Sequence, residues 1–183
     1  MARPPDPPLH AELADAVREL AQVADVADGS FVAASRRTLA RLLARDDLLE
    51  GLPEADAGSF SRRLLFADPD ERFGIWVLTW PPGCQTPIHN HHCSCAFGIF
   101  RGRIDEIVYA EDPDSEAVVE SSRFVREAGF VGGAPPRAGY VHEMLNTGGD
   151  AAVSLHIYAY RPEDHPDSIE RCFVRRSPRQ EQP

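Results

Sequence analysis

Hydrophobic residues recur at helical spacing near the N-terminus and at strand-like spacing over the rest of the chain. Between His10 and about Val26 they follow at three- or four-residue intervals, at Leu13, Val17, Leu20 and Val23. This spacing in an alanine-rich segment predicts a helix. A second helix is predicted after Asp28–Ser30, with leucines on one face, ending near Arg45. We expect both helices to pack on the outside of a sheet.

From residue 53 onward the pattern changes to short apolar runs interrupted by glycine and proline, which is typical of strands joined by turns. Turns are indicated at Asp68–Glu71 and Gly148–Asp150. The sequence therefore predicts a mainly β fold, a closed barrel or jelly roll preceded by two helices. The predicted strands are Phe60–Ala67, Phe73–Trp80, Ala96–Phe100, Ile104–Ala110, Phe124–Glu127, Gly139–Asn146, Ala152–Tyr160 and Ile169–Val174.

The length of 183 residues suits one domain with a helical extension. We expect a disordered tail over residues 1–9, helices over 10–52, the barrel over 53–176 and a second tail over 177–183. The N-terminal segment lacks the apolar run of a signal peptide, and no stretch has the apolar length of a membrane helix, so a cytoplasmic monomer without a membrane partner is predicted. A net charge of −10 argues against nucleic-acid binding.

Two residue types limit the possible chemistry. The chain has no lysine, which excludes chemistry through a lysine Schiff base. Three of the four cysteines lie close to histidines in a chain without secretion signals, so we expect reduced thiols rather than disulfides. The cysteines are Cys84, Cys93, Cys95 and Cys172.

Three histidines form a candidate metal site. His89 and His91 end an extended segment, and alternate side chains of a strand point to the same face. His142 follows about fifty residues later in a loop-then-strand context. Three imidazoles can hold a metal with open positions, although spacing alone does not distinguish iron from nickel, cobalt or zinc. His92 is expected to point away from the site.

Both histidine segments match the metal motifs of the cupin barrel. The first segment has Gly83, His89, His91, Cys95 and Gly102 at the spacing of the first motif. Cys95 stands where many cupins have a glutamate ligand. The second segment has Gly139, His142 and Asn146 at the spacing of the second motif. Three neutral imidazoles leave the metal its full positive charge, so an anionic thiolate could bind more readily than beside a carboxylate ligand.

A row of polar residues follows in the predicted strand near the C-terminus. Ser154, His156 and Tyr158 alternate with Leu155 and Ile157. A period of two places all three polar side chains on one face, where a hydroxyl, an imidazole and a phenol can form a hydrogen-bonded row in an otherwise apolar barrel.

With this row, the chain resembles the cysteine dioxygenases, thiol dioxygenases of the cupin superfamily, over roughly residues 55–175. The resemblance implies Fe(II) held by His89, His91 and His142. It also implies oxidation of a small thiol, most simply L-cysteine, with O2 to its sulfinic acid. Tyr158, oriented through His156 and Ser154, would then be catalytic.

The resemblance also implies a covalent cross-link. In some members a cysteine forms a thioether with the tyrosine. Here Cys95 matches that cysteine, Cys93 is the alternative because the loop is one residue shorter, and two free buried thiols are the third possibility.

A non-catalytic cupin that binds a metal or a small ligand is the alternative function. The polar row around Tyr158 argues against it.

A carboxylate anchor is expected in the first predicted strand. Phe60-Ser61-Arg62-Arg63 resembles the family's aromatic-x-Arg segment, which makes Arg62 the residue that pairs with the substrate carboxylate. Arg63 is the alternative, because counting back from the first metal histidine favours it. Phe60 replaces a family tyrosine, which leaves 3-mercaptopropionate, cysteamine or a natural-product thiol as alternative substrates. Members that act on mercaptopropionate tend to have glutamine at the position of Arg62, so this arginine favours cysteine.

Overall fold

The structure is a computed structural model that describes residues 8–24, 29–45, 47–50, 60–111, 117–136, 139–160 and 167–176. Two helices, α1 (Pro8–Ala21) and α2 (Ser30–Leu43), precede ten strands. The mainly β prediction with two N-terminal helices is confirmed. Residues 1–7 and 177–183 of the predicted tails lie outside the described residues. Among the described residues, no helix combines the length and the apolar character that a membrane span requires.

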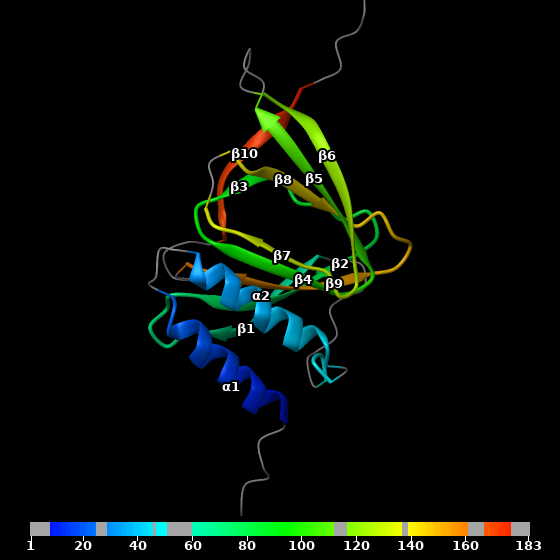
Figure 1. Cartoon of the computed structure of the whole chain (residues 1–183). Helices are drawn as coiled ribbons and strands as arrows, with labels where there is room; N and C mark the ends of the chain where they lie inside the picture. Colours follow the sequence, from blue (N-terminus) through cyan, green and yellow to red (C-terminus); the bar gives the residue numbers. More distant parts are fainter. Residues whose placement is uncertain are drawn as a thin grey trace, which may run out of the picture.

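The strands form two five-stranded sheets that face each other (Figure 1). The first sheet is antiparallel, in the order β1 (Ser61–Ala67), β2 (Gly74–Trp80), β9 (Ala152–Tyr158), β4 (Cys95–Arg101) and β7 (Val131–Ala134). The second has the order β10 (Ile169–Arg175), β3 (Ile88–His91), β8 (Val141–Leu145), β5 (Arg103–Glu111) and β6 (Ala117–Glu127). A short parallel pairing of β10 with β6 closes this second sheet on itself.

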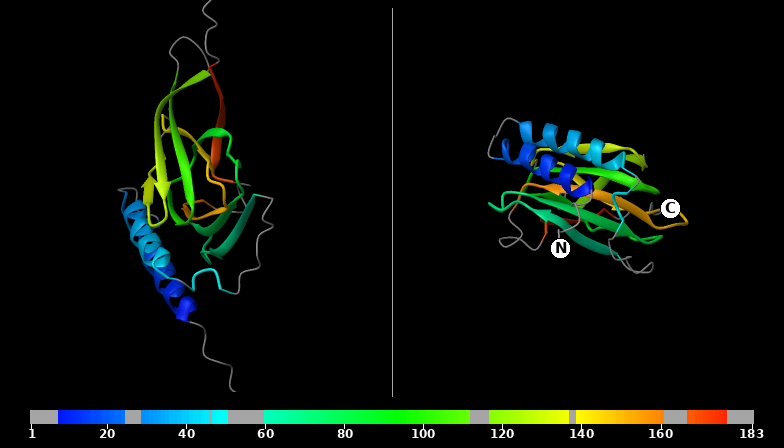
Figure 2. Two further views of the ribbon diagram at one scale, coloured as in Figure 1. Left: turned by 90° about the vertical axis from the view of Figure 1, so that its right-hand side faces the viewer. Right: turned by 90° about the horizontal axis from the view of Figure 1, so that it is seen from below.

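The two helices cover the outer face of the first sheet (Figure 2), as expected. They contribute Leu20, Phe31, Leu39 and Leu42 to a buried cluster with Ile75, Leu155 and Ile157 of the sheet. Helix α2 approaches β4 at Gly98, where an added Cβ would lie 2.6 Å from Leu43 Cδ1. Because alternate residues of β9 face the helices, the other set faces the second sheet and the barrel interior.

The observed strands differ from the predicted ones in the second half of the chain. Strand β6 begins at Ala117 rather than Phe124. Its short apolar start, residues 117–119, is followed by exposed polar residues over 120–123 that carry no apolar alternation. Strand β7 was not predicted, since its glycine pair is typical of a turn. Gly133 permits the pairing with β4, because a Cβ there would lie 2.9 Å from both Ala96 Cβ and Cys95 O. Strand β9 ends at Tyr158 rather than Tyr160, where Ala159 N donates to Ser94 O.

Candidate metal centre

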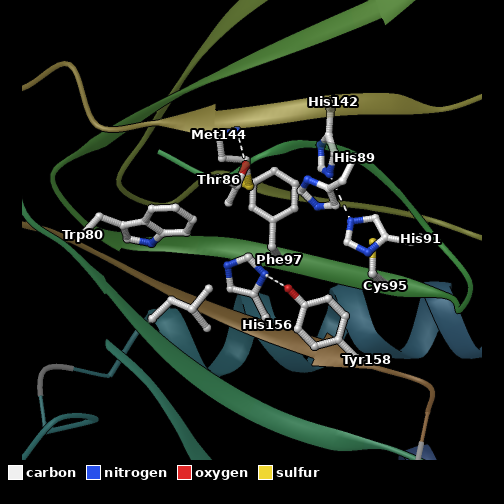
Figure 3. Close-up of a pocket in the computed structure, with 11 residues that line it drawn as sticks. Trp80, Thr86, His89, His91, Cys95, Phe97, His142, Met144, His156 and Tyr158 are labelled. Carbon is white, nitrogen blue, oxygen red and sulfur yellow. Dashed lines mark hydrogen bonds between the residues drawn. The ribbon is translucent and has the colours of Figure 1, made fainter. Parts of the chain in front are cut away.

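The three histidines meet inside the barrel. His89 and His91 project from β3, and His142 lies directly opposite His89 on β8. All three are buried, and their candidate ligand atoms lie within 4.8 Å of one another. Figure 3 shows the rings facing a common space from one sheet, with Tyr158 and His156 below them from the other. The sequence motif therefore corresponds to a compact three-histidine cluster.

Each histidine is fixed through its Nδ1 atom. His89 Nδ1 donates to Pro87 O at 2.8 Å and His91 Nδ1 to Ser168 O at 3.1 Å. His142 Nδ1 donates to Glu106 Oε1 at 3.1 Å. Because these partners can only accept, each ring keeps a hydrogen on Nδ1 and directs Nε2 at the common space. All three Nε2 lone pairs are therefore available to a metal ion.

Charge and spacing also fit a divalent metal. Burial and the neighbouring His142 lower the pKa of His89 to about 4 and that of His91 to about 2, so both rings are neutral at neutral pH. His91 Nε2 and His142 Nε2 lie 3.0 Å apart. Two nitrogen ligands at about 2.1 Å from a metal and at right angles would have about this separation. The residues present thus fit the metal that the sequence implied.

Glu106 on β5 is a site residue that sequence reasoning missed. Its carboxylate is 2% exposed and accepts hydrogen bonds from His142 Nδ1, Tyr140 OH and Arg126. Although burial opposes ionisation, these bonds lower the pKa of Glu106 to about 2. A buried carboxylate therefore holds His142 in the tautomer that a metal requires. The available signal was an acidic residue inside a predicted strand.

The polar row of β9 is continuous. Ser154 Oγ lies 2.8 Å from His156 Nε2, and His156 Nδ1 lies 2.8 Å from Tyr158 OH. Trp80, which the sequence did not single out, donates from Nε1 to Ser154 Oγ at 2.8 Å. Burial and the nearby Arg62 lower the pKa of His156 to about 3. Burial also raises the pKa of Tyr158, so both groups are neutral.

These contacts favour one direction of hydrogen bonding along the row. With Trp80 donating to Ser154, the serine hydroxyl is satisfied when it donates to His156 Nε2. The imidazole then carries its hydrogen on Nδ1 and donates to Tyr158 O. The phenol hydrogen of Tyr158 is left to point into the site, beside His91, whose ring centroid lies 5.9 Å from that of Tyr158.

The two candidate arginines lie on opposite faces of β1. Arg62 pairs with Leu78 and Arg63 with Val77, and of these β2 residues Leu78 lines the cavity while Val77 packs toward the helices. The Arg62 guanidinium carbon lies 5.6 Å from the ring centroid of Tyr158. Phe60 is 45% exposed and packs edge-on against Trp80, with ring centroids 5.1 Å apart. Arg62 therefore lies on the face of β1 that Tyr158 shares, and Arg63 on the face toward the helices.

All four cysteines are free thiols, and two of them lie near Tyr158. Cys95 is the direct cross-strand partner of Tyr158. Cys93 is 5% exposed and packs with Tyr158 and Tyr160. Burial raises the pKa of both Cys93 and Cys95, to about 12 for Cys95, so neither is a thiolate at neutral pH.

His92 lies outside the histidine cluster, as expected, with its Nε2 atom 3.1 Å from Asp167 O.

Two cavities border the cluster. The inner one has a volume of about 40 Å³ and is lined by the three histidines, by His156 and Tyr158 of the polar row, and by apolar residues such as Phe97 and Met144. The outer one, of about 330 Å³, is lined by residues that include Arg126, Phe130 and Tyr140. Cys95, Phe97 and His142 line both. The metal site is thus enclosed by apolar walls, with a larger opening on the side of His142.

One family model matches more than half of the chain. The family model for cysteine dioxygenase type I matches residues 54–170. The chain belongs to this family. Cysteine dioxygenases of this type are cupins, so the fold prediction and the resemblance are both confirmed. Membership also gives the chain a thiol dioxygenase-type function, with a histidine cluster that could bind a metal ion.

Several solved cupin structures are similar to parts of the chain. The TT1209 protein of Thermus thermophilus is 20% identical, with a TM-score of 0.48, over 62% of this chain and 95% of that one. The Cnp3 cupin domain of Schizosaccharomyces pombe is 20% identical, with a TM-score of 0.46, over 62% and 70%. An RmlC-like cupin of Shewanella frigidimarina is 16% identical, with a TM-score of 0.45, over 61% and 85%.

Proposed function

We propose that the chain oxidises a small thiol, L-cysteine in the first instance, with O2 to the sulfinic acid, and that both oxygen atoms enter the product. The observation that carries this proposal is that the histidine cluster and Tyr158 line one cavity, with the Arg62 guanidinium beside the Tyr158 ring. In such a substrate complex the histidine cluster would match the sulfur, the Tyr158 hydroxyl the reacting oxygen atoms, and Arg62 the carboxylate.

His89, His91 and His142 would hold Fe(II), which would supply the redox chemistry with O2 and the positive charge that favours a thiolate. The protein residues orient the reactants. Arg62 binds the substrate carboxylate through charge-assisted hydrogen bonds. Tyr158 directs its hydroxyl hydrogen at the sulfur and oxygen atoms, and the apolar walls exclude water.

Phe60 supports a second substrate class. Its ring has no hydroxyl to offer a substrate amine or carboxylate, so 3-mercaptopropionate, cysteamine or a larger thiol is the alternative to cysteine. Arg62 favours a thiol with a carboxylate. A cytoplasmic monomer that binds neither membrane nor nucleic acid stays the prediction from sequence.

We also propose that Cys95 forms the thioether with Tyr158, because the two residues are direct partners across β4 and β9. A bond from Sγ to the ring carbon beside the hydroxyl would replace the thiol hydrogen and one ring hydrogen, with O2 reduced to peroxide. Intact-protein mass after turnover should show the loss of two hydrogen atoms, and Cys95→Ser should abolish it. Loss of the mass change in Cys93→Ser instead would assign the bond to Cys93.

The function is tested by oxygen consumption of the Fe(II)-loaded protein with a panel of thiols, and by mass identification of the products. Uptake with L-cysteine and one O2 per sulfinate would establish the proposal. Oxygen uptake with a different thiol alone would identify that thiol as the substrate in place of L-cysteine. Metal binding without oxygen uptake for any thiol would refute it in favour of a non-catalytic cupin.

A further inference from the structure

The Arg62 guanidinium is enclosed by three aromatic side chains. Its carbon atom lies 4.0 Å from the ring centroid of Trp76, 5.6 Å from that of Tyr158 and 5.9 Å from that of Tyr160. Arg62 Nη2 also donates a hydrogen bond to Tyr160 OH. The arginine is therefore stacked on one indole face and bonded to one phenol, in addition to its position beside Tyr158.

This arrangement follows from the first sheet. Leu78 is the cross-strand partner of Arg62, and Trp76 lies two residues before Leu78 on β2. The side chains of Trp76 and Leu78 therefore share the face of the sheet on which Arg62 lies. Tyr160 comes two residues after Tyr158, just beyond the end of β9. Its ring is 6% exposed and packs with Tyr158 and Cys93. The residues that hold Arg62 are thus tied to the strand that carries the polar row.

An unsupported arginine would reach the same place only as one of many rotamers. Arginine has a long side chain, and the entropy of ordering it must be met when a ligand binds. Stacking on Trp76 fixes the plane of the guanidinium, and the bond to Tyr160 fixes its rotation within that plane. Phe60, just before β1, has no hydroxyl with which to do this. A carboxylate that binds Arg62 would therefore meet a group already oriented.

We propose that Tyr160 and Trp76 are positioning residues that orient Arg62 for a carboxylate, so that the site selects thiols carrying one. The inference rests on the proposed function, in which Arg62 is the anchor. It adds a specificity determinant that lies outside the metal site and outside the polar row.

The test is Tyr160→Phe in the full chain loaded with Fe(II). Binding of L-cysteine, 3-mercaptopropionate and cysteamine is measured by calorimetry without oxygen, and turnover by oxygen uptake. Removal of one hydrogen bond to a charged group should weaken binding of the two carboxylates about tenfold, which is about 1.4 kcal/mol. The Kd of cysteamine, which has no carboxylate, should not change. The loss should appear in KM rather than in kcat.

Tyr109→Phe is the matched control. Tyr109 is 2% exposed and accepts a hydrogen bond from Arg175, so this variant also removes a buried phenol hydroxyl bonded to an arginine. Its cluster is separate from both cavities. No Kd should change. If Tyr160→Phe does not fold, Trp76→Phe replaces it. This variant weakens the cation–π contact, so it should weaken binding of the carboxylate thiols alone, by a smaller factor.

Two results would overturn the inference: equal weakening for all three thiols, or no weakening for the carboxylates. Absence of thiol binding by the unsubstituted protein would overturn it together with the proposed function. If the carboxylate thiols bind through Tyr160 but no thiol supports oxygen uptake, the proposed function fails and the positioning role of Tyr160 stands.

Discussion

Replacement of Glu106 by glutamine should lower metal affinity without removing a metal ligand. Oε1 of Glu106 accepts from His142 Nδ1 at 3.1 Å and from Tyr140 OH at 2.7 Å, while Oε2 accepts from Arg126 Nη2 at 2.8 Å. A glutamine has the same shape but only one accepting oxygen. Whichever way the amide is oriented, one set of donors then faces an NH2 group.

The two orientations have different costs. If the NH2 group faces Arg126, a guanidinium with 21% of its side chain exposed loses its carboxylate, at a cost of about 1–3 kcal/mol in unfolding free energy. If it faces His142, the ring must move its hydrogen to Nε2, which can then no longer bind metal. Loss of such a partner lowers metal affinity about 10- to 100-fold, or about 1.4 to 2.7 kcal/mol.

Anaerobic titration of Fe(II) against a competing chelator measures this affinity. Glu143→Gln is the matched control, because Glu143 neighbours His142 on β8, is 6% exposed and is hydrogen-bonded to Arg175 rather than to a cluster histidine. It should bind metal like the unsubstituted protein. Equal losses of metal affinity in the two variants would show that the effect is general destabilisation of the fold. Unchanged metal affinity in Glu106→Gln would refute the tautomer argument.

Three further predictions concern turnover, substrate binding and stability. Tyr158→Phe should lower kcat roughly 100-fold or more while metal content, measured by elemental analysis, is retained; an unchanged rate would remove the hydroxyl from the reaction. Arg62→Gln should raise the KM for cysteine about 10- to 100-fold, whereas Arg63→Gln should not, and the reverse order would assign the anchor to Arg63. Gly98→Ala places a Cβ 2.6 Å from Leu43 Cδ1, which can rotate, and 3.2 Å from the backbone oxygen of Phe130, which cannot, so thermal unfolding should show a loss of about 1 kcal/mol with unchanged metal affinity.

Much of the site could be predicted because it depends on local periodicity. His89 and His91 share a face of β3 because they are two residues apart, and Ser154, His156 and Tyr158 share a face of β9 for the same reason. The spacing of glycines and histidines in the two motifs indicated the third ligand. Strand β7 escaped prediction because glycine pairs are more typical of turns, whereas this one is needed for close contact with β4.

The choice between Arg62 and Arg63 needed the pairing of strands. A shift of one residue in strand register moves a side chain to the opposite face of the sheet. Counting residues back from His89 crosses loops whose length varies, so the count does not fix this register. The pairing of β1 with β2 places Arg62 on the face of Tyr158, next to an irregularity between Leu64 and Phe66 that no sequence pattern shows, and so favours Arg62 as the proposed anchor. Glu106 and Trp80 were missed for a related reason: their partners lie on other strands.

The two sheets divide the work of the site. The metal histidines and Glu106 come from β3, β8 and β5 of the second sheet, whereas the polar row, Arg62 and Cys95 come from β9, β1 and β4 of the first. The sulfur end and the carboxylate end of a bound thiol would therefore be held by different sheets. Metal affinity and substrate orientation should then fail separately: substitution of a cluster histidine or Glu106 in the second sheet should release metal, and substitution of Tyr158 or Arg62 in the first should lower turnover or selectivity while the metal stays bound.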